Sequence, residues 1–142
     1  MKKIYFYAVP LLFALSSLSC SKDFLKSYER RIIGTWRIDD LNRVGIGGST
    51  SRLPFQDGQF IFAEEGQLTY IDNSGTYKGT WDIRREPAGD DQQARSLHIN
   101  VVNFTTQQSK AEYFNEVVFT GTNRFKAFIR DGVRSYVYRF ER

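Results

Sequence analysis

The sequence is poor in the residues that most often carry chemistry, with one cysteine, Cys20, and one histidine, His98. A single cysteine excludes an intrachain disulfide framework. His98 stands between apolar neighbours, which places it on the outward face of a strand, and no Gly-x-Ser-x-Gly turn accompanies it. Metal-ligand spacings and phosphate-binding glycine patterns are also missing. The sequence therefore predicts no catalytic residues, no metal and no cofactor, and it argues against an enzyme.

Strong charge of one sign is missing as well. The formal net charge is +4, and removal of Lys2 and Lys3 lowers it to +2. Such mild and dispersed charge does not predict nucleic-acid binding. What the chain has in quantity is aromatic side chains, 12 Phe, 8 Tyr and 2 Trp, which supply the core of a single domain.

The first residues have the pattern of a secretory signal. A basic pair is followed by an almost wholly apolar run over residues 4–15 and by mostly small residues up to Cys20. The apolar run is short for a membrane span, and Pro10 interrupts it. We therefore predict a signal peptide over residues 1–19.

The only thiol of the chain stands directly after this signal, an arrangement that resembles a bacterial lipoprotein. The resemblance implies that Cys20 is lipidated and attaches the protein to a membrane. One position departs from the usual pattern, since Ser17 stands where lipoproteins have leucine. The alternative is cleavage nearby, which leaves a soluble protein with a free thiol.

The residues after Cys20 resemble a sorting signal. Ser21-Lys22-Asp23-Phe24 is similar to the surface-export signal of Bacteroidota lipoproteins, and the absence of aspartate directly after the cysteine resembles outer-membrane sorting. These resemblances imply a lipid-anchored protein of the outer membrane, exposed at the cell surface. Residues 20–31 have apolar side chains at helical spacing and predict a short helix or tether.

Two similar stretches, residues 32–38 and 77–83, predict strands. Each is apolar, β-branched and aromatic, with a glycine shortly before a tryptophan. Glycine weakens a strand unless another group approaches closely there, so each Gly-Thr-Trp predicts a tryptophan packed at a backbone crossing. Trp36 and Trp81 are therefore expected in the core rather than in a binding platform.

Two hairpins follow in the middle of the chain. A three-residue loop over residues 64–66 pairs Phe62 with Leu68. A tight turn at Ser74-Gly75 pairs the next two strands, and this register places Tyr70 opposite Gly79.

The end of the chain gives the clearest register. If Asp131 and Gly132 are the turn residues, Ile129 pairs with Arg134. A loop over residues 121–123 likewise pairs Phe119 with Phe125. One face then carries seven apolar or aromatic residues: Val117, Phe119, Phe125, Ala127, Tyr136, Tyr138 and Phe140. The other face mixes charged residues with an apolar strip formed by Phe114, Val118, Phe128 and Val137. A one-residue slip would bury the charges, so the register is well specified.

Eight antiparallel strands with mostly short connections predict an all-β, up-and-down barrel over residues 32–142. The Gly-x-Trp of the first strand, followed by a run of hairpins, resembles the lipocalin-like domains of bacterial lipoproteins. This resemblance implies that Trp36 packs near an arginine close to the end of the chain. Both Arg139 and Arg142 are candidates.

Alternation of the strands gathers four connections at one end, where lipocalin-like barrels have their mouth: residues 42–57, 74–75, 105–110 and 131–132. Arg134 is expected to face inward there beside Tyr136, and the long loop carries Arg52 and Phe55. An inward arginine can receive a ligand carboxylate. These four residues are the candidate ligand-binding set; the alternative is that Arg134 is a rim residue with its head in water.

Two functions without catalysis fit these features. The first is a binding protein with a small apolar ligand at the mouth. The second is a structural or interaction module of a cell-surface assembly, with a filled core, no ligand, and a protein partner on the outer strip. The number of large aromatics in so short a chain favours a filled core.

Overall fold

The computed structural model describes residues 27–47, 49–88 and 92–142. The predicted signal peptide, Cys20 and most of the tether lie outside the described residues. The described part begins with a short helix α2 (Tyr28–Ile32), where Ser27 is the N-cap and its Oγ accepts a hydrogen bond from Arg30 N at 3.4 Å. No helix in the described ranges has both the length and the apolar character needed to cross a membrane.

Nine strands and two single-turn 3₁₀ helices follow. The helices are η3 (Thr50–Arg52) and η4 (Glu64–Gly66). The strands are β1 (Gly34–Gly45), β2 (Gln59–Phe62), β3 (Gln67–Asp72), β4 (Gly75–Ala88), β5 (Gln92–Asn103), β6 (Gln108–Phe114), β7 (Glu116–Phe119), β8 (Arg124–Asp131) and β9 (Arg134–Glu141).

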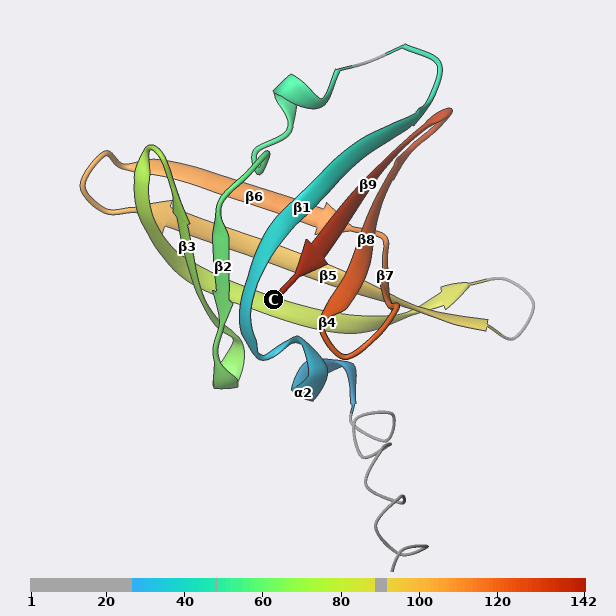
Figure 1. The fold of residues 1–142 in the computed structure, drawn as a ribbon, viewed down its shortest axis with the longest axis horizontal. Coiled ribbons are helices and arrows are strands. Elements are labelled where there is room, and N and C mark those ends of the chain that lie inside the picture. Colours follow the sequence, from blue (N-terminus) through green and yellow to red (C-terminus); the bar gives the residue numbers. More distant parts are fainter. Residues whose placement is uncertain (1–26, 48, 89–91) are drawn as a thin grey trace, which may run out of the picture.

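The strands form one curled antiparallel sheet in the order β6-β5-β4-β3-β2-β1-β9-β8-β7 (Figure 1). β1 pairs with both β2 and β9, so the start of the domain lies beside its end. β6 and β7 are the two edges of the sheet, and no ladder joins them among the described residues. The all-β, antiparallel prediction is confirmed, but the closed eight-stranded barrel is wrong, because the sheet has nine strands and is open.

The opening has a local cause at Asn115. Its backbone N–H donates to the carbonyl of Phe128 at 2.7 Å, and its Oδ1 accepts from the backbone N–H of Arg130 at 2.6 Å. The chain bends at this residue, so that β6 pairs with β5 whereas β7 pairs with β8. One predicted strand is thereby divided between the two edges of the sheet.

Because of this bend, the predicted outward position of Phe114 is wrong. The outer strip was predicted to include it, but Phe114 is fully buried and its ring lies 5.1 Å from that of Tyr138. Side-chain alternation does not carry across Asn115, so Phe114 faces the core while Val118 and Phe128 stay partly exposed.

The three-residue hairpin loops are confirmed, whereas the two tight turns are each displaced. Phe62 pairs with Leu68, and Phe119 with Phe125, as predicted. Asp72, however, pairs with Gly75, so the turn residues are Asn73 and Ser74. The cause is a hydrogen bond of 2.8 Å that Asp72 Oδ1 accepts from the backbone N–H of Ser74.

The turn between β8 and β9 is also displaced from its predicted residues. Asp131 pairs with Arg134, and Gly132, at φ 57°, is the first residue of the two-residue loop rather than the second. Both displacements change the pairing by two residues, so every side chain keeps its predicted face. The predicted inward face is therefore confirmed; Phe125, Ala127, Tyr138 and Phe140 are all buried.

Gly79 lies at a close backbone approach, as the Gly-Thr-Trp pattern predicts. The residue opposite it on β3 is Leu68, however, and not the predicted Tyr70. A Cβ at this position would stand only 1.9 Å from the carbonyl oxygen of Asn100 on β5. The glycine therefore lets two strands approach, with Trp81 buried two residues later.

Aromatic rings fill the space enclosed by the sheet. Phe125 stacks on Phe140 at 4.4 Å and meets Trp36 edge-on at 4.7 Å. Phe60 lies 4.7 Å from Tyr70, and Tyr70 lies 5.6 Å from Tyr77. The core therefore runs the length of the domain, as the aromatic content predicts.

One end of the domain is covered by α2 and the last residue. The guanidinium of Arg142 lies 4.1 Å from the Trp36 ring centroid and donates to the carbonyl of Arg31 at 2.7 Å. Trp36 Nε1 donates to the carbonyl of Ile32 at 2.6 Å. Of the two arginines considered from the sequence, Arg142 packs on the tryptophan, whereas Arg139 pairs with Asp40 on the outside at 2.9 Å.

Candidate functional site

The end of the domain opposite α2 contains a cleft of about 690 Å³. It lies where the sheet is open, between β6 on one side and the β8–β9 hairpin on the other, with the η3 segment against it (Figure 1). Eight residues line it: Ser49, Arg52, Leu53, Glu112, Ile129, Asp131, Arg134 and Tyr136. This cleft is called the mouth cleft below.

Three of the four residues predicted to bind a ligand, Arg134, Arg52 and Tyr136, line the mouth cleft together. The fourth, Phe55, does not. It is fully buried, 4.9 Å from the ring of Tyr70, and its carbonyl accepts a hydrogen bond from the Tyr138 hydroxyl at 2.8 Å. Burial of its large apolar ring is favourable, so Phe55 packs in the core and anchors the loop there instead of lining the cleft.

Glycines on the neighbouring segment leave room for Arg134. β1 continues to Gly45, past the expected start of the loop, and Gly45 pairs with Arg134 at φ 110°. A Cβ there would stand 2.4 Å from the carbonyl oxygen of Val133, so only glycine fits. A Cβ at Gly47 would lie 3.9 Å from a guanidinium nitrogen of Arg134. The distance at Gly47 is an ordinary contact, so it is Gly45 that lets the end of β1 lie against Arg134.

Neither arginine of the mouth cleft forms an ion pair with a residue that the structure describes. Within the described ranges, no carboxylate lies at ion-pair distance from Arg134 or Arg52. Arg134 is partly buried, and Arg52 lies exposed at the end of η3. Two guanidinium groups that line a cleft in this way are suited to bind a carboxylate through charge-assisted hydrogen bonds.

Glu112 is a lining residue that the sequence did not single out. It pairs with the buried Ile99 and faces the inside of the sheet. Its side chain accepts a hydrogen bond from the backbone N–H of Tyr113 at 3.0 Å. Burial raises the pKa of Glu112 in spite of that hydrogen bond. The burial of Phe114, two residues later on the same face, is the signal that would have placed Glu112 inward.

Lys110, a second charged residue on the inward face of β6, has a counter-ion. Its ammonium forms a 2.5 Å ion pair with Asp72 and lies 5.1 Å and 4.9 Å from the rings of Tyr70 and Tyr77. Burial alone would raise the pKa of Asp72, but hydrogen bonds from Lys110 and Ser74 outweigh it and lower this pKa to about 2. Lys110 therefore has its counter-charge within the fold.

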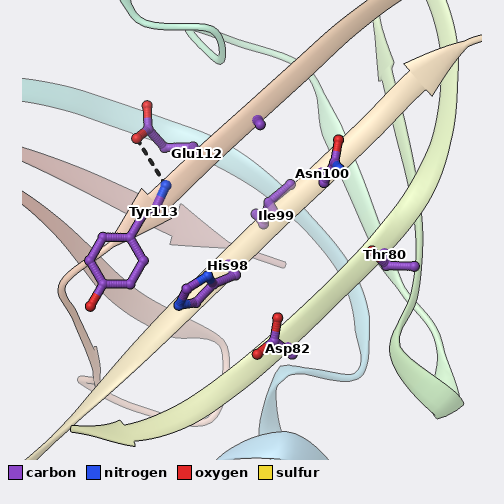
Figure 2. Close-up of a pocket in the computed structure, with 8 residues that line it drawn as sticks. Thr80, Asp82, His98, Ile99, Asn100, Glu112 and Tyr113 are labelled. Atoms are coloured by element: carbon purple, nitrogen blue, oxygen red, sulfur yellow. Dashed lines mark hydrogen bonds between the residues drawn. The ribbon is translucent and has the colours of Figure 1, made fainter.

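A second cleft, of about 490 Å³, lies on the outer face of β4, β5 and β6 (Figure 2). His98 lies there, as predicted, with its ring edge-on to Tyr113 at 4.5 Å. Its Nε2 is shielded and has no hydrogen-bond partner in the described part of the chain. Asp82, the neighbour of His98 on β4, accepts from Arg84 Nε at 2.5 Å, and Glu112 extends to the other side of β6. The outer cleft thus lacks an acid–base pair.

Two further features bear on function. Among residues 27–47, 49–88 and 92–142, no group of three or more His, Cys, Asp or Glu side chains could hold a metal ion. Beside the mouth cleft, the tip formed by the end of β1 and the β8–β9 turn exposes Val44, Ile46 and Val133 to 58%, 88% and 81%.

Comparison with known proteins gives no further assignment, because the chain matches no protein-family model, no curated protein and no solved structure.

Proposed function

We propose that this protein is a binding protein, without catalytic activity, that holds a small carboxylate ligand in the mouth cleft. The observation that carries this proposal is that Arg134 and Arg52 line one cleft together with Tyr136, while no carboxylate of the described residues pairs with either arginine. Arg134 is partly buried, and partial burial of an arginine without a counter-ion is unfavourable, which a ligand carboxylate would offset.

The packing of the core bears on the size of the ligand. Phe55, Phe60 and Tyr70 are fully buried in contact with one another, and none of them lines the cleft. A long hydrocarbon chain would have to displace such rings to enter the core, so we place the ligand in the cleft itself. Its apolar contacts there are Leu53 and Ile129. The apolar ligand expected from the sequence thus becomes a short acid with a modest apolar part.

The proposed setting is a lipocalin-like lipoprotein of the outer membrane, anchored through Cys20 and exposed at the cell surface. The support is the signal-like start of the sequence and its single thiol. α2 lies at the end of the domain opposite the mouth cleft, so a tether leading into α2 would leave the cleft facing away from the membrane (Figure 1). A multiply acylated cysteine anchors stably, whereas a single chain does not.

The anchor is tested by membrane fractionation of the full chain. Cys20→Ser is expected to release the protein from the membrane fraction, and Ser17→Leu is expected to leave it there. Sedimentation of Cys20→Ser with membranes would contradict the lipid anchor.

The binding function is tested by fluorescence titration of the folded domain with dansyl-labelled carboxylic acids of short and long chain. We expect saturable binding of the short acid, weakened about ten- to a hundredfold by Arg134→Ala and less by Arg52→Ala. Arg139→Ala is the matched control, because Arg139 already pairs with Asp40 on the outer face. A flat titration with every acid would exclude the proposed function.

The second candidate function is an interaction module without a ligand. One observation favours it: Val44, Ile46 and Val133 form an exposed apolar tip on a domain whose core is already filled. This function expects that Ile46→Asp releases the protein from an assembly in gently solubilised membranes, while all ligand titrations stay flat.

A further inference from the structure

We infer that the ligand of the mouth cleft is a zwitterion, whose carboxylate binds Arg134 and whose amine binds Glu112. This inference rests on the proposed function and names its ligand class. Short peptides and amino acids with an apolar side chain have this chemistry.

The two groups come from opposite sides of the cleft. Arg134 is the first residue of β9, whereas Glu112 is on β6, the far edge strand of the open sheet. No strand of the described chain joins β6 to β8 or β9. A ligand that contacts both groups therefore bridges the opening, with its acidic end at one wall and its basic end at the other.

The surroundings of Glu112 favour binding of a ligand cation. It is half-buried, and its only hydrogen bond within the described ranges comes from the backbone N–H of its neighbour Tyr113. No Lys, Arg or His of those ranges forms an ion pair with it. A carboxylate taken partly out of water without a counter-charge is unfavourable, and a ligand amine would supply that charge.

Lys110 provides an internal comparison on the same strand and the same face. It stands two residues before Glu112, and the fold gives it a counter-ion, Asp72, at 2.5 Å. β6 can therefore neutralise an inward charge from within the protein, yet it does not do so at Glu112. Asp131, the other acidic residue of the cleft, is exposed. It is the strand partner of Arg134 in the β8–β9 hairpin, so it lies on the same side of the cleft as Arg134.

The experiment is calorimetric titration of the folded domain with a Leu-Phe dipeptide and its N-acetyl form. Both have a free carboxylate, and only the first has an amine. We expect the free dipeptide to bind at least about tenfold more tightly than the acetylated one. Glu112→Gln should abolish this preference by weakening only the free dipeptide. Glu116→Gln is the matched control, because Glu116 pairs with Arg130 on the outer face.

Each other outcome has a separate meaning. Equal binding of the two peptides would overturn the zwitterion and leave the carboxylate site intact. Binding of the dansyl acids, with Arg134 dependence but without binding of either peptide, would do the same. If neither the acids nor the peptides bind, both the inference and the proposed function fail. The comparison of the two peptides on the unmodified protein decides the question even if Glu112→Gln does not fold.

Discussion

The two ends of the domain use arginine in opposite ways. At the end covered by α2, Arg142 lies on Trp36 at 4.1 Å and Arg31 lies on Phe119 at 4.2 Å, and each donates to a backbone carbonyl. At the mouth, Arg134 and Arg52 line a cleft and, in the described part of the chain, pair with no carboxylate. Charge at the first end packs within the fold, whereas we propose that charge at the second binds a ligand.

The same contrast appears within β6. Lys110 is neutralised by Asp72 and lies near two tyrosine rings, while Glu112, on the same face, has as its one hydrogen-bond partner among the described residues the backbone N–H of Tyr113. Stability measurements should therefore separate residues that hold the fold from residues that line the mouth cleft.

The largest effect is expected in the core. Phe125→Ala should lower the free energy of unfolding by about 3–5 kcal/mol, because Phe125 is fully buried between Trp36 and Phe140. Phe128→Ala, on the outer face, should cost much less. Denaturant unfolding of both variants checks the prediction, and equal losses would overturn the assignment of the two faces.

The crossing at Gly79 should give the next largest effect. Gly79→Ala places a Cβ 1.9 Å from the carbonyl oxygen of Asn100, so β5 must move, at a cost of about 2–3 kcal/mol. Gly121→Ala is the control, since a Cβ there meets nothing within 4 Å. Thermal unfolding that gives similar values for both variants would contradict the close approach of β4 and β5.

The Asp72–Lys110 pair should contribute about 1–2 kcal/mol at neutral pH. The pKa of Asp72 falls from 3.8 to about 2 on folding, so the folded state favours the ionised form. This stability is complete above pH 4 and is lost as the pH falls toward 2. Asp72→Asn should therefore destabilise the protein at pH 7 and have little effect near pH 2. A loss independent of pH would show that packing, not charge, is responsible.

The smallest effects are expected at the mouth. Arg134→Ala should change the free energy of unfolding by less than about 0.5 kcal/mol. Glu112→Gln should stabilise slightly at pH 7, because the pKa of Glu112 is raised on folding and its ionised form is disfavoured there. That gain should vanish below the pKa of the unfolded chain, near 4.5. A large loss from either variant at pH 7 would assign these residues to the fold instead of a ligand.

Much of the sheet could be predicted from the sequence because hydrophobic alternation fixes which face each residue occupies. The inward positions from Val117 to Phe140 are correct even though two tight turns are displaced, since a shift of two residues preserves the face. The turn after Asp72 was displaced because the Asp72 side chain accepts a hydrogen bond from the backbone N–H of Ser74, which competes with the glycine signal.

The open edge could not be predicted in this way. Asn115 ends one ladder and starts another through two hydrogen bonds to β8, and no local pattern identifies that change of partner. The error reversed the face of Phe114 and left Glu112, two residues earlier on the same strand, unconsidered. The candidate cleft was accordingly predicted from one side only. Arg134, Arg52 and Tyr136 line it, whereas Phe55, which was expected beside them, is buried in the core, and the lining residue Glu112 was not considered.

The most direct test of the account is nitrogen-15 amide NMR mapping of the domain during titration with the Leu-Phe dipeptide. We expect saturable shift changes at residues 49–53, 112 and 129–136, and unchanged signals at α2, Trp36 and Arg142. Saturable changes at the α2 end, or no saturable change in the mouth cleft with the dipeptide or with the short dansyl acid, would contradict the claim that the mouth charges serve a ligand.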